Sequence, residues 1–232
     1  MRRINLPFLA IALCAGAQSA SADSYNWTGF YAGIHLGGVW GTGRANDLSG
    51  WNGVGNSFSA TSSGFNGGVQ AGYNWQIPSA GILFGIEGDL GYTGIKGSAI
   101  SALALTQSSG TTVSTSGSLY GTVRGRLGVA WGQALLYGTG GLMLASAKAQ
   151  VADNVFTTTI QTGNTGTQAG WTVGGGLEFS LAGALSGWTM KGEYLYFDLG
   201  TKTVSGTNAI GTFNWDINTT GNVARFGLNR RF

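Results

Sequence analysis

Few side chains in this chain are of a type that does chemistry, and they do not form a catalytic group. The only histidine is His35, and on an extended strand its same-face neighbours are Gly33 and Gly37. Its own strand therefore supplies no Ser, Asp or Glu partner, and Glu87 or Glu178 would have to reach it from other strands. The sequence contains no serine-nucleophile, zinc or phosphate-binding motif. We therefore expect no catalytic residue, no metal site and no cofactor.

Eight charged side chains recur instead on the polar face of alternating segments: Glu87, Asp89, Arg124, Arg126, Glu178, Lys191, Glu193 and Arg225. They are four acids and four bases, so they can neutralise one another if they share an interior. Such a set allows two kinds of chemistry. A salt-bridged plug would fix the shape of the protein, whereas a hydrated lining would conduct ions. The balance of charge favours the plug.

A two-residue alternation of apolar and polar residues predicts the strands that position these charges. In the segment 65–75, Val69 and Tyr73 fall on one face, and Gln70 and Asn74 fall on the other. A helix would scatter this pattern around its circumference. Eight segments are predicted as strands: 27–40, 65–75, 82–92, 119–131, 135–147, 171–181, 188–199 and 222–232. The facing of the segment 135–147 stays ambiguous.

The composition indicates that these strands face lipid. Charged residues make up 9% of the chain, against roughly 25% in a soluble domain. Aromatic residues (12%) and hydrophobic residues (43%) are too abundant for a disordered chain, despite 43 glycines. The predicted strands are about 11–14 residues long, which suits a tilted membrane strand better than a soluble strand of about 5–6 residues.

A membrane-spanning sheet must close, because lipid offers no partner for free backbone N–H and C=O groups. Its apolar face then points outward. An outward Arg or Lys would cost about 2–4 kcal/mol near the membrane midplane, so we expect the eight charges to point inward. A barrel of about eight strands is just wide enough for its own side chains to fill it, which again favours a plug over an ion pathway.

The connections alternate between short and long ones. The segments 76–81, 132–133 and 182–187 are short, whereas 42–63, 96–116, 149–168 and 201–221 are long and rich in Gly, Ser, Thr and Asn. Such alternation is typical of periplasmic turns and extracellular loops. The predicted fold is therefore all-β, an eight-stranded antiparallel up-and-down transmembrane barrel. The uncharged stretch 127–147 is also long enough for a membrane helix, but its five glycines and the turn at Gly132 favour a hairpin.

Residues 1–22 have the features of a cleavable secretory signal peptide. Two arginines precede an apolar run, and an Ala-Ser-Ala cleavage site ends at Ala22. The barrel domain is then 23–232, and it has no cysteine because the only one lies in the leader. Without the two leader arginines the chain keeps 10 of its 12 basic residues against 9 acidic ones. Apart from Arg230-Arg231 no basic cluster remains, so we expect no nucleic-acid partner.

Seven large aromatic residues fall near the predicted strand ends: Trp27, Trp40, Trp75, Tyr92, Trp131, Trp171 and Trp188. Trp and Tyr are enriched at both membrane–water interfaces, so we expect two aromatic girdles. A sugar-binding platform is the alternative interpretation. The recurrence of these residues at both rims favours the girdles.

Four motifs follow one another along the chain after the leader. They are WTGFYAGIHLGGVWG at 27–41, LLYGTGGLMLA at 135–145, WTMKGEYLYFDLG at 188–200 and RFGLNRRF at 225–232. Together they resemble the alphaproteobacterial outer-membrane immunogenic protein family, small porin-like barrels related to the transmembrane domain of outer membrane protein A. The resemblance implies a major surface-exposed structural protein of the bacterial outer membrane.

The resemblance also implies insertion by the barrel-assembly machinery, which recognises a terminal strand that ends in an aromatic residue. Phe226, Leu228 and Phe232 fit this insertion signal, whereas Arg230 stands where an aromatic residue is commoner. The expected surroundings are outer-membrane lipid and lipopolysaccharide. The loops would meet extracellular or host ligands.

Three functions follow from these features. The favoured one is a structural and surface-interaction barrel, serving envelope integrity, adhesion or an immunogenic surface, without catalysis. The first alternative is a narrow porin that passes small solutes or ions. The second is a surface binder of haem, which rests on the family alone because no Met or His cluster supports it.

Overall fold

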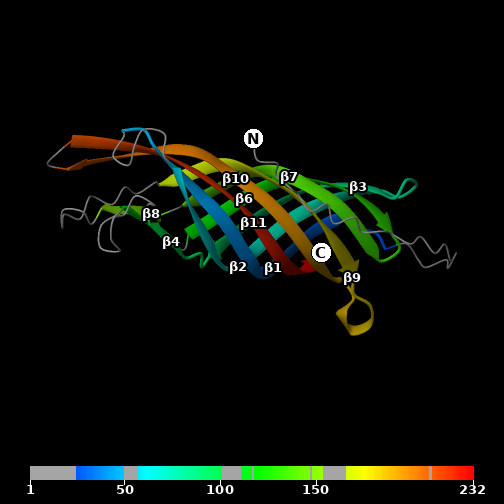
Figure 1. Ribbon diagram of the computed structural model, residues 1–232. Coiled ribbons are helices and arrows are strands. Elements are labelled where there is room, and N and C mark those ends of the chain that lie inside the picture. Colours follow the sequence, from blue (N-terminus) through cyan, green and yellow to red (C-terminus); the bar gives the residue numbers. More distant parts are fainter. Residues whose placement is uncertain are drawn as a thin grey trace, which may run out of the picture.

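The chain forms a closed barrel of eight antiparallel strands, in the order β1-β11-β10-β9-β7-β6-β3-β2 (Figure 1). The computed structural model describes residues 25–49, 57–100, 111–116, 118–146, 148–153, 166–208 and 211–232. The barrel strands are β1 (Gly29–Asp47), β2 (Ser57–Ile77), β3 (Ile82–Thr93), β6 (Ser118–Trp131), β7 (Ala134–Ser146), β9 (Thr167–Ser180), β10 (Trp188–Asn208) and β11 (Gly211–Arg231). The predicted fold class is confirmed. The predicted leader, 1–22, lies outside the described residues.

The first and last barrel strands close the sheet. Strand β1 pairs with β11 without interruption from Tyr31↔Arg231 to Asp47↔Trp215. On its other side β1 pairs with β2, again over nearly its whole length. Strand β1 therefore has a partner on both sides, and the closed wall has no free edge. A sheet without free edges can be placed in lipid.

Short turns join the strands at one end of the barrel, here called the turn end. The two-residue turn between β6 and β7 contains Gly132 at φ +58°, a left-handed conformation that glycine adopts without steric cost. A 3-10 turn, Gly183–Leu185, lies between β9 and β10. The hairpin β6–β7 removes the alternative of a membrane helix over 127–147. Among the described residues, no helix is long and apolar enough to cross a membrane.

Side chains alternate between the outside and the inside of the barrel along every strand. On β7, whose facing the sequence left ambiguous, Leu135 and Tyr137 are buried inside, whereas Leu136 and Leu142 are exposed on the outer surface. The same alternation on the other strands leaves large apolar side chains on the outside. The apolar outer surface is therefore the reverse of the polar surface of a soluble protein.

Four strands, β1, β2, β10 and β11, extend far beyond their predicted segments. The β1–β2 and β10–β11 hairpins continue through most of the segments 42–63 and 201–221, which are predicted as loops. Polar cross-strand pairs support the added length: Thr203 Oγ1 donates to Asp216 Oδ1 (2.6 Å) and Ser205 Oγ donates to Asn214 Oδ1 (2.6 Å). The prediction was wrong here because the apolar alternation ends, although threonine is itself a good strand former.

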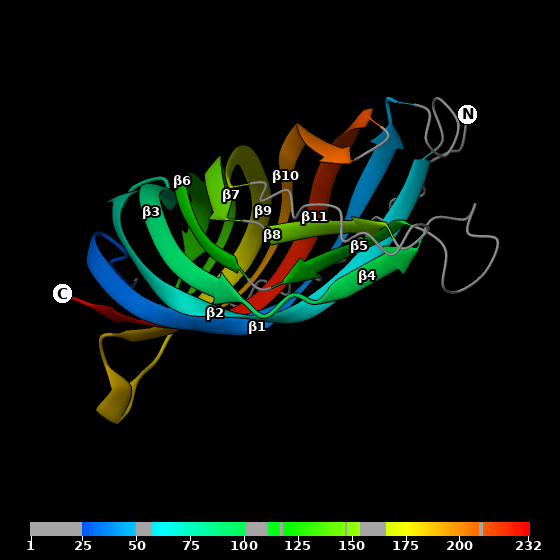
Figure 2. The ribbon, with the colours of Figure 1, turned by 90° about the vertical axis from the view of Figure 1, so that its left-hand side faces the viewer.

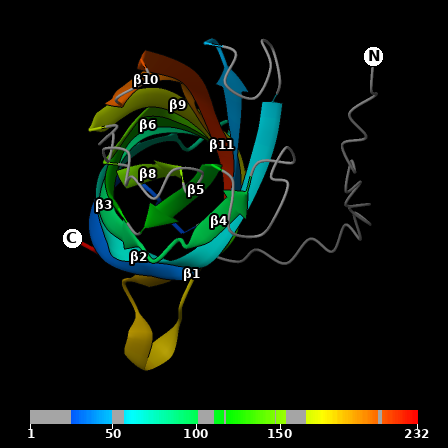
Figure 3. The ribbon, with the colours of Figure 1, turned by 60° about the vertical axis from the view of Figure 1, so that its left-hand side comes forward.

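A second sheet occupies parts of the other two predicted loops, 96–116 and 149–168. Its strands are β4 (Gly97–Ile100), β5 (Thr111–Ser116) and β8 (Lys148–Asp153), in the order β4-β5-β8. A bridge between Ser63 and Lys96 joins this sheet to the barrel wall. It lies at the end reached by the long hairpins, here called the loop end (Figure 2), and Figure 3 looks into the ring of strands.

Three inward tyrosines lie over glycines of the neighbouring strand. Tyr31 is paired with Gly72, Tyr120 with Gly91, and Tyr137 with Gly176. A Cβ on Gly91 would lie 2.5 Å from Tyr120 Oη, and a Cβ on Gly176 would lie 2.6 Å from Tyr137 Oη. These glycines are therefore required for space, because each leaves room for a tyrosine to reach across the interior.

Gly176→Ala is expected to destabilise the barrel, since the added Cβ would also lie 2.6 Å from the carbonyl oxygen of Gly192. Overpacking of this kind costs about 1–3 kcal/mol of unfolding free energy. Urea titration of the refolded protein in detergent micelles, followed by Trp fluorescence, measures the loss. Gly138→Ala is the matched control, because its nearest contact would be the Gly174 oxygen at 3.9 Å. Equal losses in both variants would contradict the steric explanation.

Candidate functional site

The barrel interior holds the eight charged residues singled out from the sequence. All eight are buried: Glu87, Asp89, Arg124, Arg126, Glu178, Lys191, Glu193 and Arg225. They come from β3, β6, β9, β10 and β11, so the alternation on five strands brings them to one place. Their side chains form ten ion-pair contacts in which no side chain is more than 3% exposed. We call this set the lumen charge network.

Glu87 is the centre of the network. Its carboxylate accepts hydrogen bonds from Arg124 Nη2 (2.5 Å), from Lys191 Nζ (2.8 Å to both oxygens) and from Tyr31 Oη (2.7 Å). These donors lie on β6, β10 and β1, whereas Glu87 lies on β3. One acid thus ties together strands from different sides of the barrel.

Two further carboxylates bridge the cations towards the loop end. Asp89 accepts from Arg124 Nη2 (2.9 Å) and from Arg225 Nη2 (3.0 Å). Glu193 pairs with Arg225 Nη2 at 2.6 Å and with Arg124 Nη1 at 3.2 Å. Each arginine therefore meets more than one acid. Such sharing is what allows guanidinium groups to stay charged away from water.

Arg126 and Glu178 form the part of the network nearest the turn end. Arg126 Nη2 lies 2.7 Å from Glu178 Oε2, and its guanidinium carbon lies 3.9 Å from the ring centre of Tyr137. Glu178 also accepts from Thr189 Oγ1 (2.5 Å) and Asn229 Nδ2 (3.0 Å). The lone pairs of the carboxylate are thus satisfied by neutral donors as well as by a cation.

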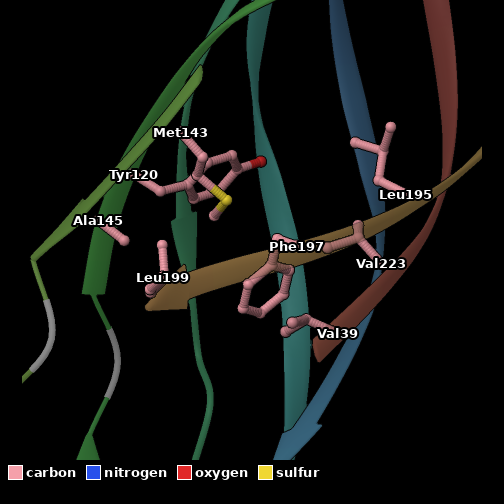
Figure 4. Close-up of a cluster of buried hydrophobic side chains, with 8 residues drawn as sticks. All are labelled: Val39, Tyr120, Met143, Ala145, Leu195, Phe197, Leu199 and Val223. Atoms are coloured by element: carbon pink, nitrogen blue, oxygen red, sulfur yellow. The ribbon is translucent and has the colours of Figure 1, made fainter. Parts of the chain in front are cut away.

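Apolar layers lie on both sides of the network, and they are not among the features predicted from the sequence. Towards the turn end, Trp27, Leu83, Leu135 and Tyr137 pack together. Towards the loop end, a larger cluster fills the interior: Val39, Tyr120, Met143, Ala145, Leu195, Phe197, Leu199 and Val223 (Figure 4). The sequence could have predicted them, because Val39 and Phe197 are each an even number of residues from an inward polar residue, His35 and Glu193. The interior is therefore polar only in its middle.

Trp27 corrects the predicted aromatic girdle. It is fully buried inside the barrel, with its ring 4.8 Å from that of Tyr25 at 74°. Its backbone N–H donates to Gln76 Oε1 (2.8 Å). The residue precedes the first strand, so the alternation of β1 did not fix its direction, and burial in the turn-end layer decided it.

His35 is held as a hydrogen-bonded interior group. Its Nε2 lies 2.8 Å from Tyr120 Oη, which also accepts from Asn66 Nδ2 (2.8 Å). Nδ1 is buried without a hydrogen-bond partner among the described residues, so no Ser, Asp or Glu orients the ring there. Within that part of the chain, no three His, Cys, Asp or Glu side chains are grouped as metal ligands.

Comparison with known proteins identifies the family of this barrel. A family profile described as "Outer membrane protein beta-barrel domain" matches residues 8–232. The chain belongs to this outer-membrane barrel family. The closed eight-stranded sheet agrees with that assignment, and the family resemblance drawn from the sequence motifs is confirmed.

Relatives of this outer-membrane barrel include the 31 kDa outer-membrane immunogenic protein of Brucella melitensis. It is 36% identical over 192 residues, which cover 80% of this chain and 77% of the relative. The 22 kDa outer membrane protein of Rhizobium leguminosarum is 34% identical over 139 residues, covering 60% and 54% of the two chains. Among solved structures, OprG from Pseudomonas aeruginosa has a TM-score of 0.55 at 10% identity, covering 89% of this chain and 98% of that chain. OprG supports the fold alone.

In an outer-membrane barrel the turn end is periplasmic and the loop end is extracellular. Six of the predicted aromatic residues lie on the outer surface, three towards each end of the strands. Trp75, Trp131 and Trp188 lie towards the periplasm, and Trp40, Tyr92 and Trp171 lie towards the outside. Five are 41–50% exposed, and Trp188 is half-buried with the guanidinium of Arg230 5.8 Å from its ring centre.

The three residues of the predicted insertion signal also lie on the outer surface of this outer-membrane barrel. Phe226 (78%), Leu228 (39%) and Phe232 (81%) are all exposed to the lipid side. Arg230 follows the same outward phase, and its Nη1 donates to the carbonyl oxygen of Ser186 (2.7 Å) in the periplasmic turn. Since Arg230 sits at the periplasmic rim, its charge stays at the level of lipid headgroups.

Glu87→Gln is expected to destabilise the folded barrel by about 3–5 kcal/mol, because it leaves Arg124 and Lys191 without the charge that they share. Urea unfolding in lipid vesicles, followed by Trp fluorescence, measures the change. Arg44→Gln is the control, since Arg44 is exposed and its change should stay within about 0.5 kcal/mol. A Glu87→Gln protein as stable as the control would show that the network adds nothing to stability.

Proposed function

We propose that this protein is a closed outer-membrane barrel with a structural and surface-interaction role and without catalysis. The spanning strands anchor it in the membrane, and the extracellular β-extension formed by the β1–β2 and β10–β11 hairpins meets surrounding molecules. The observation that carries the proposal is the filled interior, in which a neutral charge network lies between two apolar layers.

The geometry of the interior supports closure over ion conduction. An ion pathway needs charged groups in contact with water, but the side chains of the lumen charge network are at most 3% exposed. Its four acids and four bases cancel, so they give no selectivity for one sign of ion. The extracellular apolar layer adds a second barrier, because ions lose their hydration in an apolar constriction.

Within the part of the chain that the structure describes, the surroundings of His35 support a non-enzymatic role. His35 lies below the extracellular apolar layer and is 1% exposed, so a substrate has no access to it. Its hydrogen-bond partner is Tyr120, not a carboxylate. The Brucella and Rhizobium relatives are named as outer-membrane immunogenic or outer membrane proteins, names that point to surface exposure and to no reaction.

The refolded protein in a planar lipid bilayer is expected to show no steady single-channel openings. The sealed interior leaves no continuous water column for ions. Arg124→Gln and Glu87→Gln are tested beside it, using only protein that shows the heat-dependent gel mobility of a folded barrel. Steady openings of the unaltered protein, with a conductance that changes in either variant, would overturn the proposal and favour a narrow pore.

We also propose that the barrel-assembly machinery inserts the protein through its terminal strand. The outward row of Phe226, Leu228 and Phe232 on β11 presents the aromatic end of this strand to the outside of the barrel. The backbone N–H of Phe232 still pairs with the carbonyl oxygen of Phe30 (3.0 Å). The last residue is thus held in the wall while its ring stays free for recognition.

Phe232→Ala is expected to lower the amount of assembled barrel in the outer membrane by at least several-fold, since recognition precedes folding. Pulse-chase labelling with gels of unheated samples measures the folded fraction over time. Phe65→Ala is the control, because Phe65 is also exposed (60%) on the outer surface but lies on β2. If both variants assemble at the rate of the unaltered protein, Phe232 is only an interface anchor.

A further inference from the structure

Along the long strands, the outer surface changes from apolar to polar. Towards the turn end of β11, Phe226 and Leu228 are outside and Arg225 is inside. Further along the same strand, Trp215 (3% exposed) and Ile217 (6%) are buried on the inside. The outer surface there is polar. An apolar interior with a polar exterior is the arrangement of a protein in water, so the inversion marks where the wall leaves the hydrocarbon.

The inversion falls at a row of residues that suits the membrane boundary. Trp40 on β1 is paired with Asn222 on β11 and with Ser63 on β2. Trp40 lies 6.2 Å from Tyr194, whose hydroxyl donates to Asn222 Oδ1 (2.6 Å). Interfacial Trp and Tyr side chains lie at the level of lipid headgroups. The residues just beyond this row therefore face the headgroups of the outer leaflet.

A continuous polar surface begins directly beyond the boundary row. It consists of the outward side chains of 42–46 on β1, 57–61 on β2, 201–205 on β10 and 214–220 on β11, and we call it the polar sheet face. The described side chains on it carry hydroxyl or amide groups, apart from Arg44 and Asp216, whose charges are opposite. A bulge between Asp198 and Thr201, with Gly200 at φ +70°, shifts the phase of β10. Thr201 and Thr203 are exposed as a result.

The first row of this face is made of three threonines on adjacent strands. Thr42 on β1 is paired with Thr61 on β2 and with Thr220 on β11. Thr42 and Thr61 are exposed and Thr220 is half-exposed. Within the described part of the chain, their hydroxyl groups have no hydrogen-bond partner, in contrast to Thr203, which donates to Asp216. The threonine row therefore has unused donors and acceptors at the headgroup level.

We propose that the polar sheet face binds the sugar headgroup of the outer leaflet's glycolipid. Hydroxyl and amide side chains both donate and accept, as sugar hydroxyls do, so the two surfaces can satisfy each other. The face is continuous with the lipid-contacting band of the same four strands, so a glycolipid whose acyl chains lie on that band places its sugars here. The inference rests on the proposed surface role but not on a closed lumen.

Other partners fit this face less well. A purely anionic headgroup needs a basic cluster, whereas Arg44 is the one cation among the described outward side chains of this face, and Asp216 offsets it. Protein interfaces depend on buried aromatic or apolar anchors. No such anchor is found among the described outward residues in the three rows that run from Thr42 to Asn46 on β1. The face therefore fits a neutral, hydroxyl-rich ligand better than an anionic lipid or a protein.

The test replaces the hydroxyls of the threonine row without changing the shape of the wall. The triple variant Thr42→Val, Thr61→Val and Thr220→Val keeps β-branched side chains, which favour strands. The matched control is Thr167→Val, an exposed threonine at the extracellular end of β9, on another part of the barrel. Binding is measured by thermophoresis of the folded full barrel in neutral detergent. The four probes are lipopolysaccharide with its core sugars, lipid A without them, the soluble core oligosaccharide, and phosphatidylglycerol.

Lipopolysaccharide with core sugars is expected to bind best, and the triple variant is expected to bind it about tenfold more weakly, while the control is unchanged. Equal binding by the triple variant and the unaltered protein would overturn the proposal. Equal binding of phosphatidylglycerol would also overturn it, since charge and not sugar would then be recognised. Binding of the soluble oligosaccharide as tight as that of the whole glycolipid would assign the face to free carbohydrate. Bilayer conductance reports separately on the lumen, so either proposal can fail alone.

Discussion

Mutual neutralisation of buried charges is the interaction on which this barrel depends. Four carboxylates and four cations are removed from water, and each would be costly alone. They persist because Glu87, Asp89 and Glu193 each meet more than one cation, at distances of 2.5–3.8 Å. The network links strands across the interior, so it fixes the relative positions of walls that no hydrogen-bond ladder joins directly.

Glycines leave the space for this network, and tyrosines donate hydrogen bonds to two of its carboxylates. Tyr31 and Tyr137 lie over glycines of neighbouring strands and donate to Glu87 (2.7 Å) and Glu193 (2.9 Å). Tyr120 uses the same arrangement to reach His35. Glycine, which in another protein would indicate a flexible linker, here makes room at Gly72, Gly91 and Gly176 for large side chains inside a narrow cylinder.

The outer surface of the wall has three zones, which face hydrocarbon, lipid headgroups and water. Within the membrane the outer surface is apolar and the interior is filled. At the boundary rows, aromatic side chains face the headgroups. Beyond them the strands continue as an ordinary water-facing sheet, with Trp215 and Ile217 inside and hydroxyl groups outside. One set of strands thus passes from lipid into water, and the proposed surface role rests on the part that stands outside the lipid.

The sequence by itself determined the barrel, its eight spanning strands and the inward direction of all eight charged residues. A two-residue alternation fixes facing wherever a strand is continuous, so Glu87 and Arg124 needed no tertiary information. Tertiary structure alone decided which acid meets which base, because pairing across the interior depends on register and shear. It also decided the direction of Trp27, which precedes the alternating pattern, and the length of the strands beyond Trp40. There the apolar signal ends, and only the partner strand determines whether a polar segment becomes a wall or a loop.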